Sequence, residues 1–210
     1  MHDISALIGI ATALAIGAVS PGPSFVMVAR TAASSNRVNG ISAAVGMGLG
    51  GFIFALLSLI GLVDLLVAVP TLYLVLKIAG GLYLAYLGIR IWNGANDSLS
   101  VSENTWPARG NNVLRYFGLG LATQLSNPKT AIVYASVFAA FLPKLPSMEF
   151  KASVVVIVFM IEAIWYSVVA VMLSGETSRK KYLHFKSLID RVAGGIMLAL
   201  GLKLVVSSSK

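Results

Sequence analysis

The chain has no cysteine, 2 histidines and only 8 acidic residues among its 210 positions. Without cysteine it can form no disulfide and use no thiolate chemistry, and the redox compartment stays open. His2 and His184 are far apart in the sequence. The sequence also lacks a metal-ligand cluster, a nucleophile elbow and a phosphate-binding loop. We therefore expect no metal and no cofactor, and we do not expect an enzyme.

Charge is scarce, with 11% charged and 57% hydrophobic residues. Soluble domains average about 25% charged residues, so this composition indicates a membrane protein. Several uncharged stretches approach or exceed the roughly 20 residues that a membrane-spanning helix needs. Joining stretches that a single charge divides predicts an all-α polytopic membrane protein. Its six transmembrane helices are expected at about residues 4–29, 39–63, 70–92, 114–142, 150–173 and 188–206.

The net charge of +8 does not indicate nucleic-acid binding, because the basic residues fall in predicted loops and on no aromatic-rich face. Met1-His2-Asp3 lacks the positive segment of a signal peptide, so we expect the first span to stay in the mature protein. The loops after spans one, three and five hold ten basic residues, against five on the other side. By the positive-inside tendency the richer side is cytoplasmic, and both termini lie outside.

A sequence repeat relates the third and sixth spans. Lys77–Ala85 (KIAGGLYLA) aligns with Arg191–Ala199 (RVAGGIMLA) without a gap. The first and fourth spans also correspond, since each contains a polar break. The sequence thus predicts two three-helix repeats, at 1–97 and 110–210, joined by a polar linker at 98–109. Because three is an odd number, the second repeat starts on the opposite side of the membrane, and the repeats are inverted.

Small residues spaced four apart predict close helix packing, because they let helix backbones approach each other within a membrane. We interpret them as packing seams, and such seams would also permit a homodimer. The pairs are Gly46 and Gly50, Gly81 and Ala85, and Gly195 and Ala199.

The two polar breaks are the strongest functional signal. A Ser or Asn next to Pro is typical of a helix start, so each break ends one half-helix and begins another. The N–H end of a half-helix suits a carboxylate, and the carbonyl end suits an ammonium. An ordinary proline kink is the alternative, but two matching breaks favour a site for a zwitterionic amino acid. The expected binding residues are Ser20, Pro21, Gly22, Pro23, Asn127, Pro128 and Lys129.

Glu162 stands about ten residues into the fifth predicted span, near the centre of the bilayer. A carboxylate there must face a cavity, pair with a cation or be protonated. It could hold the substrate ammonium, carry a coupling proton, or neutralise a nearby lysine or arginine. Trp165 and Tyr166 follow at i+3 and i+4, so they could line the same pocket or simply pack. Gln124, four residues before Pro128, could also line it.

These residues resemble the pattern of the lysine exporter and homoserine/threonine resistance family of bacterial amino-acid exporters. The resemblance covers essentially the whole chain and rests on Ser20–Pro23 with Phe25–Ala29, Asn127–Lys129, Glu162–Tyr166 and Asp190–Gly195. It implies export of amino acids through a multi-pass protein of the inner membrane, driven by the proton gradient. The Glu162–Tyr166 form is most similar to the threonine and homoserine branch, which implies a small neutral substrate.

The expected partners are therefore an amino acid, protons and the lipid bilayer, with no nucleic acid. Three alternatives stay open from the sequence. An exporter of basic amino acids would need a group that satisfies the extra cation. An intramembrane enzyme acting on a lipid could use Glu162 as acid or base, although no second catalytic group stands at matched depth. A membrane scaffold would assist a partner without transporting anything.

Overall fold

The computed structural model describes residues 2–20, 22–68, 70–96, 111–143 and 145–208. Within these ranges it contains eight α-helices, one short 3-10 helix and no strand, which confirms the all-α prediction. The elements are α1 (His2–Val19), α2 (Pro23–Ser34), α3 (Arg37–Ala68), α4 (Pro70–Asn93), η1 (Gly94–Asn96), α5 (Val113–Ser126), α6 (Pro128–Phe141), α7 (Met148–Leu173) and α8 (Glu176–Ser208).

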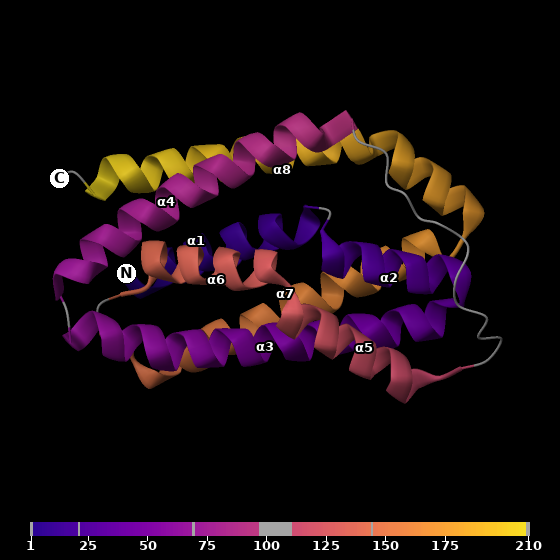
Figure 1. Cartoon of the computed structure of the whole chain (residues 1–210), viewed down its shortest axis with the longest axis horizontal. Coiled ribbons are helices and arrows are strands. Elements are labelled where there is room, and N and C mark those ends of the chain that lie inside the picture. Colours follow the sequence, from indigo (N-terminus) through magenta and orange to yellow (C-terminus); the bar gives the residue numbers. More distant parts are fainter. Residues whose placement is uncertain (1, 21, 69, 97–110, 144, 209–210) are drawn as a thin grey trace.

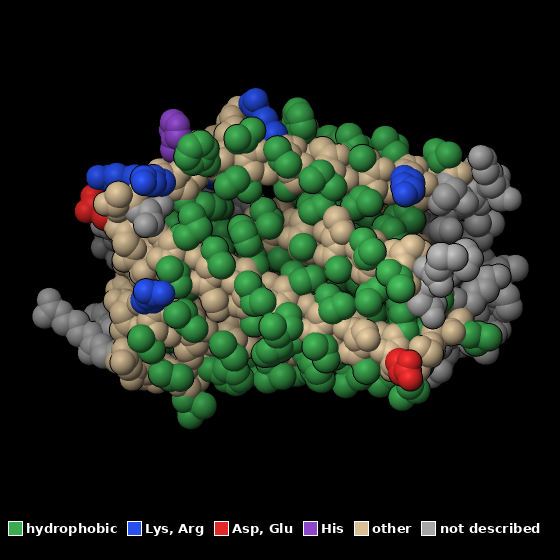
Figure 2. Space-filling model, turned by 180° about the vertical axis from the view of Figure 1, so that it is seen from behind, with side chains coloured by type: hydrophobic (Ala, Val, Ile, Leu, Met, Phe, Trp, Pro, Cys, Tyr) green, Lys and Arg blue, Asp and Glu red, His purple; other side chains and the backbone are tan. Residues whose placement is uncertain are grey.

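Length and composition identify the helices that can cross a membrane. Arg37–Gly61 of α3 and Met148–Leu173 of α7 are each long and apolar enough. Ile4–Val19 of α1 and Pro23–Ser34 of α2 qualify together as one broken span, bent by 54°. Hydrophobic side chains cover the middle of the face in Figure 2, and most visible charged side chains lie toward its two ends. The chain is a membrane protein with at least two spans, and the six-span arrangement stays a prediction.

Both helix breaks fall where the sequence predicts them. In the first, α1 ends at Val19 and α2 begins at Pro23; in the second, Asn127 alone separates α5 from α6. Pro23 and Pro128 each occupy the first turn of the following helix. Proline is favoured there because the N–H that it lacks would have no intrahelical partner anyway. The two prolines therefore start new helices and do not merely kink continuous ones.

The long helices pack in a layered bundle (Figure 1). α4 runs along α8 at one edge of the molecule, α3 packs against α5 and α7, and α1 and α6 lie in contact between them. The predicted glycine seams lie in these interfaces. A Cβ on Gly194 would come within 2.7 Å of the Gly88 carbonyl oxygen, and one on Gly81 within 3.0 Å of the Gly201 oxygen. The interpretation of Gly81 and Ala85 as a packing seam is confirmed. On α8, in contrast, the close approach is made by Gly194 and not by the predicted Gly195, whose Cβ would come no nearer than 3.4 Å to a side-chain atom of Trp92.

Two apolar clusters divide the interior. One includes Val133, Tyr134 and Phe138 of α6 together with residues of α1, α3, α4, α7 and α8. The other centres on Phe25 of α2, which stacks on Tyr182 with ring centroids 5.6 Å apart. The helices that flank the breaks contribute to both clusters, with residues of α1 and α6 in the first and residues of α2 in the second.

The glycine seam generates a stability prediction. Gly194→Ala places a methyl group against backbone atoms of α4, which cannot move aside as a side chain can, so we expect a loss of about 1–3 kcal/mol despite the better helix propensity of alanine. Gly118→Ala is the matched control, because a Cβ there would meet nothing within 4 Å. Thermal unfolding in detergent measures both variants. A Gly194→Ala protein as stable as the control would contradict the seam.

Candidate functional site

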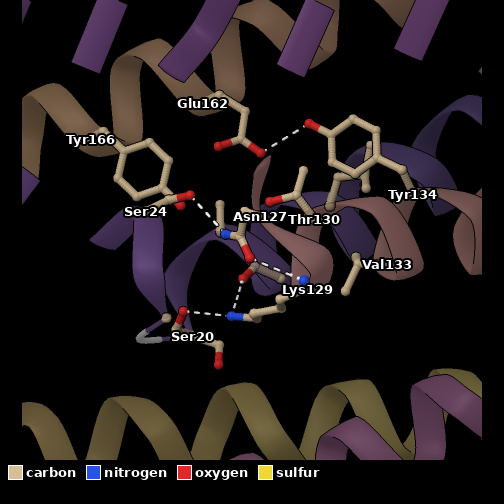
Figure 3. A pocket seen from close by; sticks show the side chains of 13 residues that line it. Ser20, Ser24, Asn127, Lys129, Thr130, Val133, Tyr134, Glu162 and Tyr166 are labelled. Atoms are coloured by element: carbon tan, nitrogen blue, oxygen red, sulfur yellow. Dashed lines mark hydrogen bonds between the residues drawn. The ribbon is translucent and has the colours of Figure 1, made fainter. Parts of the chain in front are cut away.

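The two helix breaks meet at a small void bordered by α1, α2, α6 and α7 (Figure 3). We call it the Glu162 void. Its volume is about 20 Å³, which is room for about one water molecule. Both halves of the chain contribute polar side chains to its lining, namely Ser20, Ser24, Asn127, Lys129, Thr130, Tyr134, Glu162 and Tyr166.

Lys129 joins the second break to the first. Its ammonium donates hydrogen bonds to the carbonyl oxygens of Gly17 (3.1 Å) and Ser20 (2.7 Å) at the end of α1 (Figure 3). The last carbonyls of a helix lack intrahelical partners and carry the negative end of the helix dipole, so they stabilise a cation. In this conformation the chain's own ammonium occupies the place that the sequence suggested for an ammonium of the substrate.

Asn127 fixes the second break from two sides. Its side-chain oxygen accepts a hydrogen bond from the backbone N–H of Lys129 (3.0 Å), which caps α6. Its amide nitrogen donates to the Ser24 hydroxyl (2.8 Å), and Ser24 in turn donates to the side-chain oxygen of Gln124 (2.6 Å). This buried chain of side chains holds together α2, α5 and α6 at the point where both spans are interrupted.

Glu162 lies on α7 with only 4% of its surface exposed. One carboxylate oxygen, Oε1, accepts a hydrogen bond from the Tyr134 hydroxyl (2.9 Å), while Oε2 has no hydrogen-bond partner among the described residues. Gly51 of α3 makes room for this pair, because a Cβ there would lie 2.9 Å from the Tyr134 hydroxyl and 3.0 Å from Glu162 Cγ. A buried, half-satisfied carboxylate is expensive, and it can accept a donor from a ligand.

The two breaks differ at their helix starts. Asn127 caps α6 with its own side chain, whereas α2 begins after Gly22 without a side-chain cap among the described residues. The N–H groups at the start of α2 are therefore more available to bind an anion than those at the start of α6. Lys129 adds positive charge nearby, since a Cβ on Gly22 would lie 3.4 Å from its ammonium nitrogen.

The structure brings most of the predicted site residues together. Ser20, Gly22, Asn127, Lys129, Glu162 and Tyr166 line the Glu162 void. Gln124 is fully buried and reaches the void through its bond to Ser24. Pro23 and Pro128 line a larger neighbouring cavity of about 470 Å³, and Pro21 lies outside the described residues.

Trp165 lies apart from the other predicted residues. It lines an apolar groove with Ala15, Val19 and Ile161, away from the Glu162 void. Residues at i+3 and i+4 of a helix flank residue i on opposite sides, about 100° apart, so Tyr166 can face the void while Trp165 faces the groove. The structure therefore does not place Trp165 and Tyr166 in one pocket.

Sequence reasoning missed Ser24, Thr130 and Tyr134, which all line the void. A helical signal for two of them is present, because Thr130 and Tyr134 are one turn apart and follow the second break directly. The sequence also left open whether a lysine or an arginine neutralises Glu162. Among the described side chains none forms a salt bridge with it; the pairs found are Lys180–Glu176 and Lys186–Asp190.

Half-helices that end inside an apolar bundle, with an ammonium at their ends and a buried carboxylate on a neighbouring helix, are typical of polytopic membrane transporters. The family model of the LysE type translocator matches residues 15–208, and the chain belongs to this family. Because its members are translocators, the alternative of an intramembrane enzyme is excluded.

Similar proteins agree with this assignment. The chain is 29% identical over 195 residues to the threonine efflux protein of Salmonella typhi, covering 91% of this chain and 93% of the relative. It is 28% identical over 192 residues to the threonine efflux protein of Escherichia coli K12, with the same coverage. An uncharacterized membrane protein of Haemophilus influenzae is 30% identical over 191 residues, 90% of each chain. No solved structure matches the chain significantly.

The buried side-chain network generates a second prediction. Ser24→Ala removes the partner of both Gln124 and Asn127, so we expect about 1–3 kcal/mol of destabilisation, seen as a lower thermal midpoint. Ser126→Ala, in the second break, is the matched control because that exposed hydroxyl bonds only to carbonyls of its own helix. Equal midpoints for the two variants would show that the network does not stabilise the breaks.

Proposed function

We propose that this chain is a secondary active exporter of small neutral amino acids, such as threonine or homoserine, driven by the proton gradient. Membership in a family of translocators supports the class, and the relatives named threonine efflux proteins support the substrate. The observation that carries the proposal is the buried Glu162 carboxylate, which keeps one oxygen without a partner among the described residues and belongs to a residue that lines the same void as Lys129.

A zwitterionic amino acid supplies both missing charges. Its ammonium would bind the free carboxylate oxygen of Glu162 and make a charge-assisted hydrogen bond. Its carboxylate would bind near the uncapped start of α2, with Lys129 as the counter-charge. Among the described residues that line the void, Glu162 is the only acidic one, so the second cation of a basic amino acid would stay unpaired there. A small neutral side chain fits these groups better.

The void must enlarge before a substrate can bind, because about 20 Å³ is far below the size of an amino acid. The helix contacts support an exchange between two inverted repeats. In the two predicted repeats α1 corresponds to α5, α2 to α6, α3 to α7 and α4 to α8. α3 contacts α7 and α4 contacts α8, so corresponding helices pack against each other. The contact between α1 and α6 in turn corresponds to the contact between α5 and α2. We propose that these two halves, 1–97 and 110–210, rock against each other around the breaks, which is how inverted repeats give alternating access.

The proposal places the protein in the inner membrane with both termini outside. Arg30 at the end of α2, Arg90 at the end of α4 and Lys180 at the start of α8 are all exposed. They belong to the side that holds most of the basic residues, and this side is retained in the cytoplasm by the positive-inside tendency.

Substitution of the two buried charges tests the site. In proteoliposomes loaded with threonine, we expect Glu162→Gln and Lys129→Ala each to lower the saturable efflux rate at least about tenfold, since each removes one of the charges that holds the zwitterion. Glu149→Gln and Lys180→Ala are the matched controls, both exposed at helix starts, and they should retain wild-type flux. Unchanged flux in both site variants would refute the assignment.

The direction of the pH dependence tests the coupling. If a proton enters as each amino acid leaves, acidifying the outer side of right-side-out vesicles accelerates threonine efflux, and collapsing the gradient with an ionophore removes the acceleration. Glu162→Gln cannot exchange a proton, so its residual efflux should not respond to the gradient. Wild-type efflux that follows only the threonine gradient would show that the transport is not coupled to protons.

A further inference from the structure

A second polar cavity lies next to the Glu162 void. We call it the α4–α8 cavity, because Arg90 of α4 and Asp190 and Lys186 of α8 line it. Its volume of about 470 Å³ lies within the range of small-molecule binding sites. Ser20, Gly22 and Lys129 line both spaces, so the two are neighbours on one route.

Asp190, which lines this cavity, has one acceptor oxygen without a partner among the described residues. Only 1% of the residue is exposed, and one carboxylate oxygen, Oδ2, accepts a hydrogen bond from the Lys186 ammonium (2.7 Å). Lys186 also donates to the Ala95 carbonyl (3.3 Å). The other oxygen, Oδ1, is buried without a partner among the described residues. A buried acceptor of this kind is rare unless a water or a ligand satisfies it.

Arg90 supplies the opposite charge on the facing helix. α4 packs along α8, and Arg90 lines the same cavity as Asp190. A guanidinium binds a carboxylate with two parallel hydrogen bonds, and a carboxylate oxygen binds an ammonium. The cavity thus presents a carboxylate and a guanidinium, the pair of charges that a zwitterion requires, on helices other than the one that carries Glu162. Lys129, at the shared border, and Lys186 line it as further cations.

We infer that the α4–α8 cavity is a second binding site for a small zwitterionic amino acid, with its ammonium on Asp190 and its carboxylate on Arg90. This inference rests on the proposed function and makes the cavity the site that is occupied before the Glu162 void. Passage between the two requires Lys129 to release the carbonyls of Gly17 and Ser20, because its ammonium holds them at the shared border.

Thiol labelling tests the second site without requiring transport. Since the chain has no cysteine, Ile132→Cys, which lies on the cavity wall and is 45% exposed, carries the only thiol. We expect threonine to protect it from a small water-soluble maleimide. Protection should persist with Glu162→Gln, whereas Asp190→Asn should raise the half-protecting concentration at least about tenfold. Leu119→Cys, in the cavity between α2 and α5 that adjoins the α4–α8 cavity at Pro23 and Val26 but is lined by neither Arg90 nor Asp190, is the control and should not be protected.

A double variant separates binding from structural pairing. If Asp190 served only to neutralise Lys186, Lys186→Met combined with Asp190→Asn would restore protection, because no charge would remain unpaired. We expect no restoration, with the thermal midpoint showing that the double variant folds. Restored protection in the double variant would overturn the second site. So would a lack of protection when Ile132→Cys is the only change, or protection that depends on Glu162 and not on Asp190.

The same proteins distinguish the two hypotheses. Threonine efflux without protection of Ile132→Cys would overturn the second site and leave the exporter standing. Protection without any efflux would support a binding site at Asp190 and overturn the proposed export.

Discussion

The bond between the Lys129 ammonium and the carbonyls of Gly17 and Ser20 is the contact on which the interior depends. A helix that stops inside an apolar bundle leaves polar backbone groups that lipid cannot satisfy. At the end of α1 a lysine from the other half of the chain satisfies them. The same lysine follows Asn127, whose side chain caps α6. One short segment therefore stabilises two helix ends and ties the two halves together.

The remaining polar groups are satisfied unequally, and this inequality gives the site its chemistry. Ser24 joins the side-chain oxygen of Gln124 to the amide nitrogen of Asn127 and so fixes the geometry of the breaks, although the amide nitrogen of Gln124 has no partner among the described residues. Glu162 keeps one oxygen without a partner. A site in which every group were paired would gain nothing from a ligand. Here the hydrogen bonds of the breaks hold the surrounding helices in place. The Glu162 carboxylate, which would bind the ammonium, keeps one oxygen without a hydrogen bond among the described residues, and this lowers the stability of the fold.

The sequence predicted the helical class, both breaks and the burial of Glu162 because each has a local signature: uncharged stretches, Ser or Asn next to Pro, and an isolated charge in an apolar span. It left open whether Trp165 and Tyr166 line the pocket or simply pack, and it could not separate the two residues, because the direction in which each side chain points depends on the neighbouring helices. Tyr134 was missed for the same reason. Its role arises only from the approach of α6 to α7 past Gly51, which no local pattern encodes.

Lys129 also explains why a zwitterion suits this architecture better than a simple ion. Removing the ammonium from the end of α1 leaves the carbonyls of Gly17 and Ser20 unsatisfied in a place without bulk water. In the proposed exchange, a substrate carboxylate would draw Lys129 away, and the ammonium on the same molecule would offset the loss by binding Glu162 or the vacated carbonyls. An anion alone would offer only the first exchange and a cation only the second. Only a molecule that carries both charges would replace the contacts between Lys129 and the carbonyls with a new set in which every charged group has a partner.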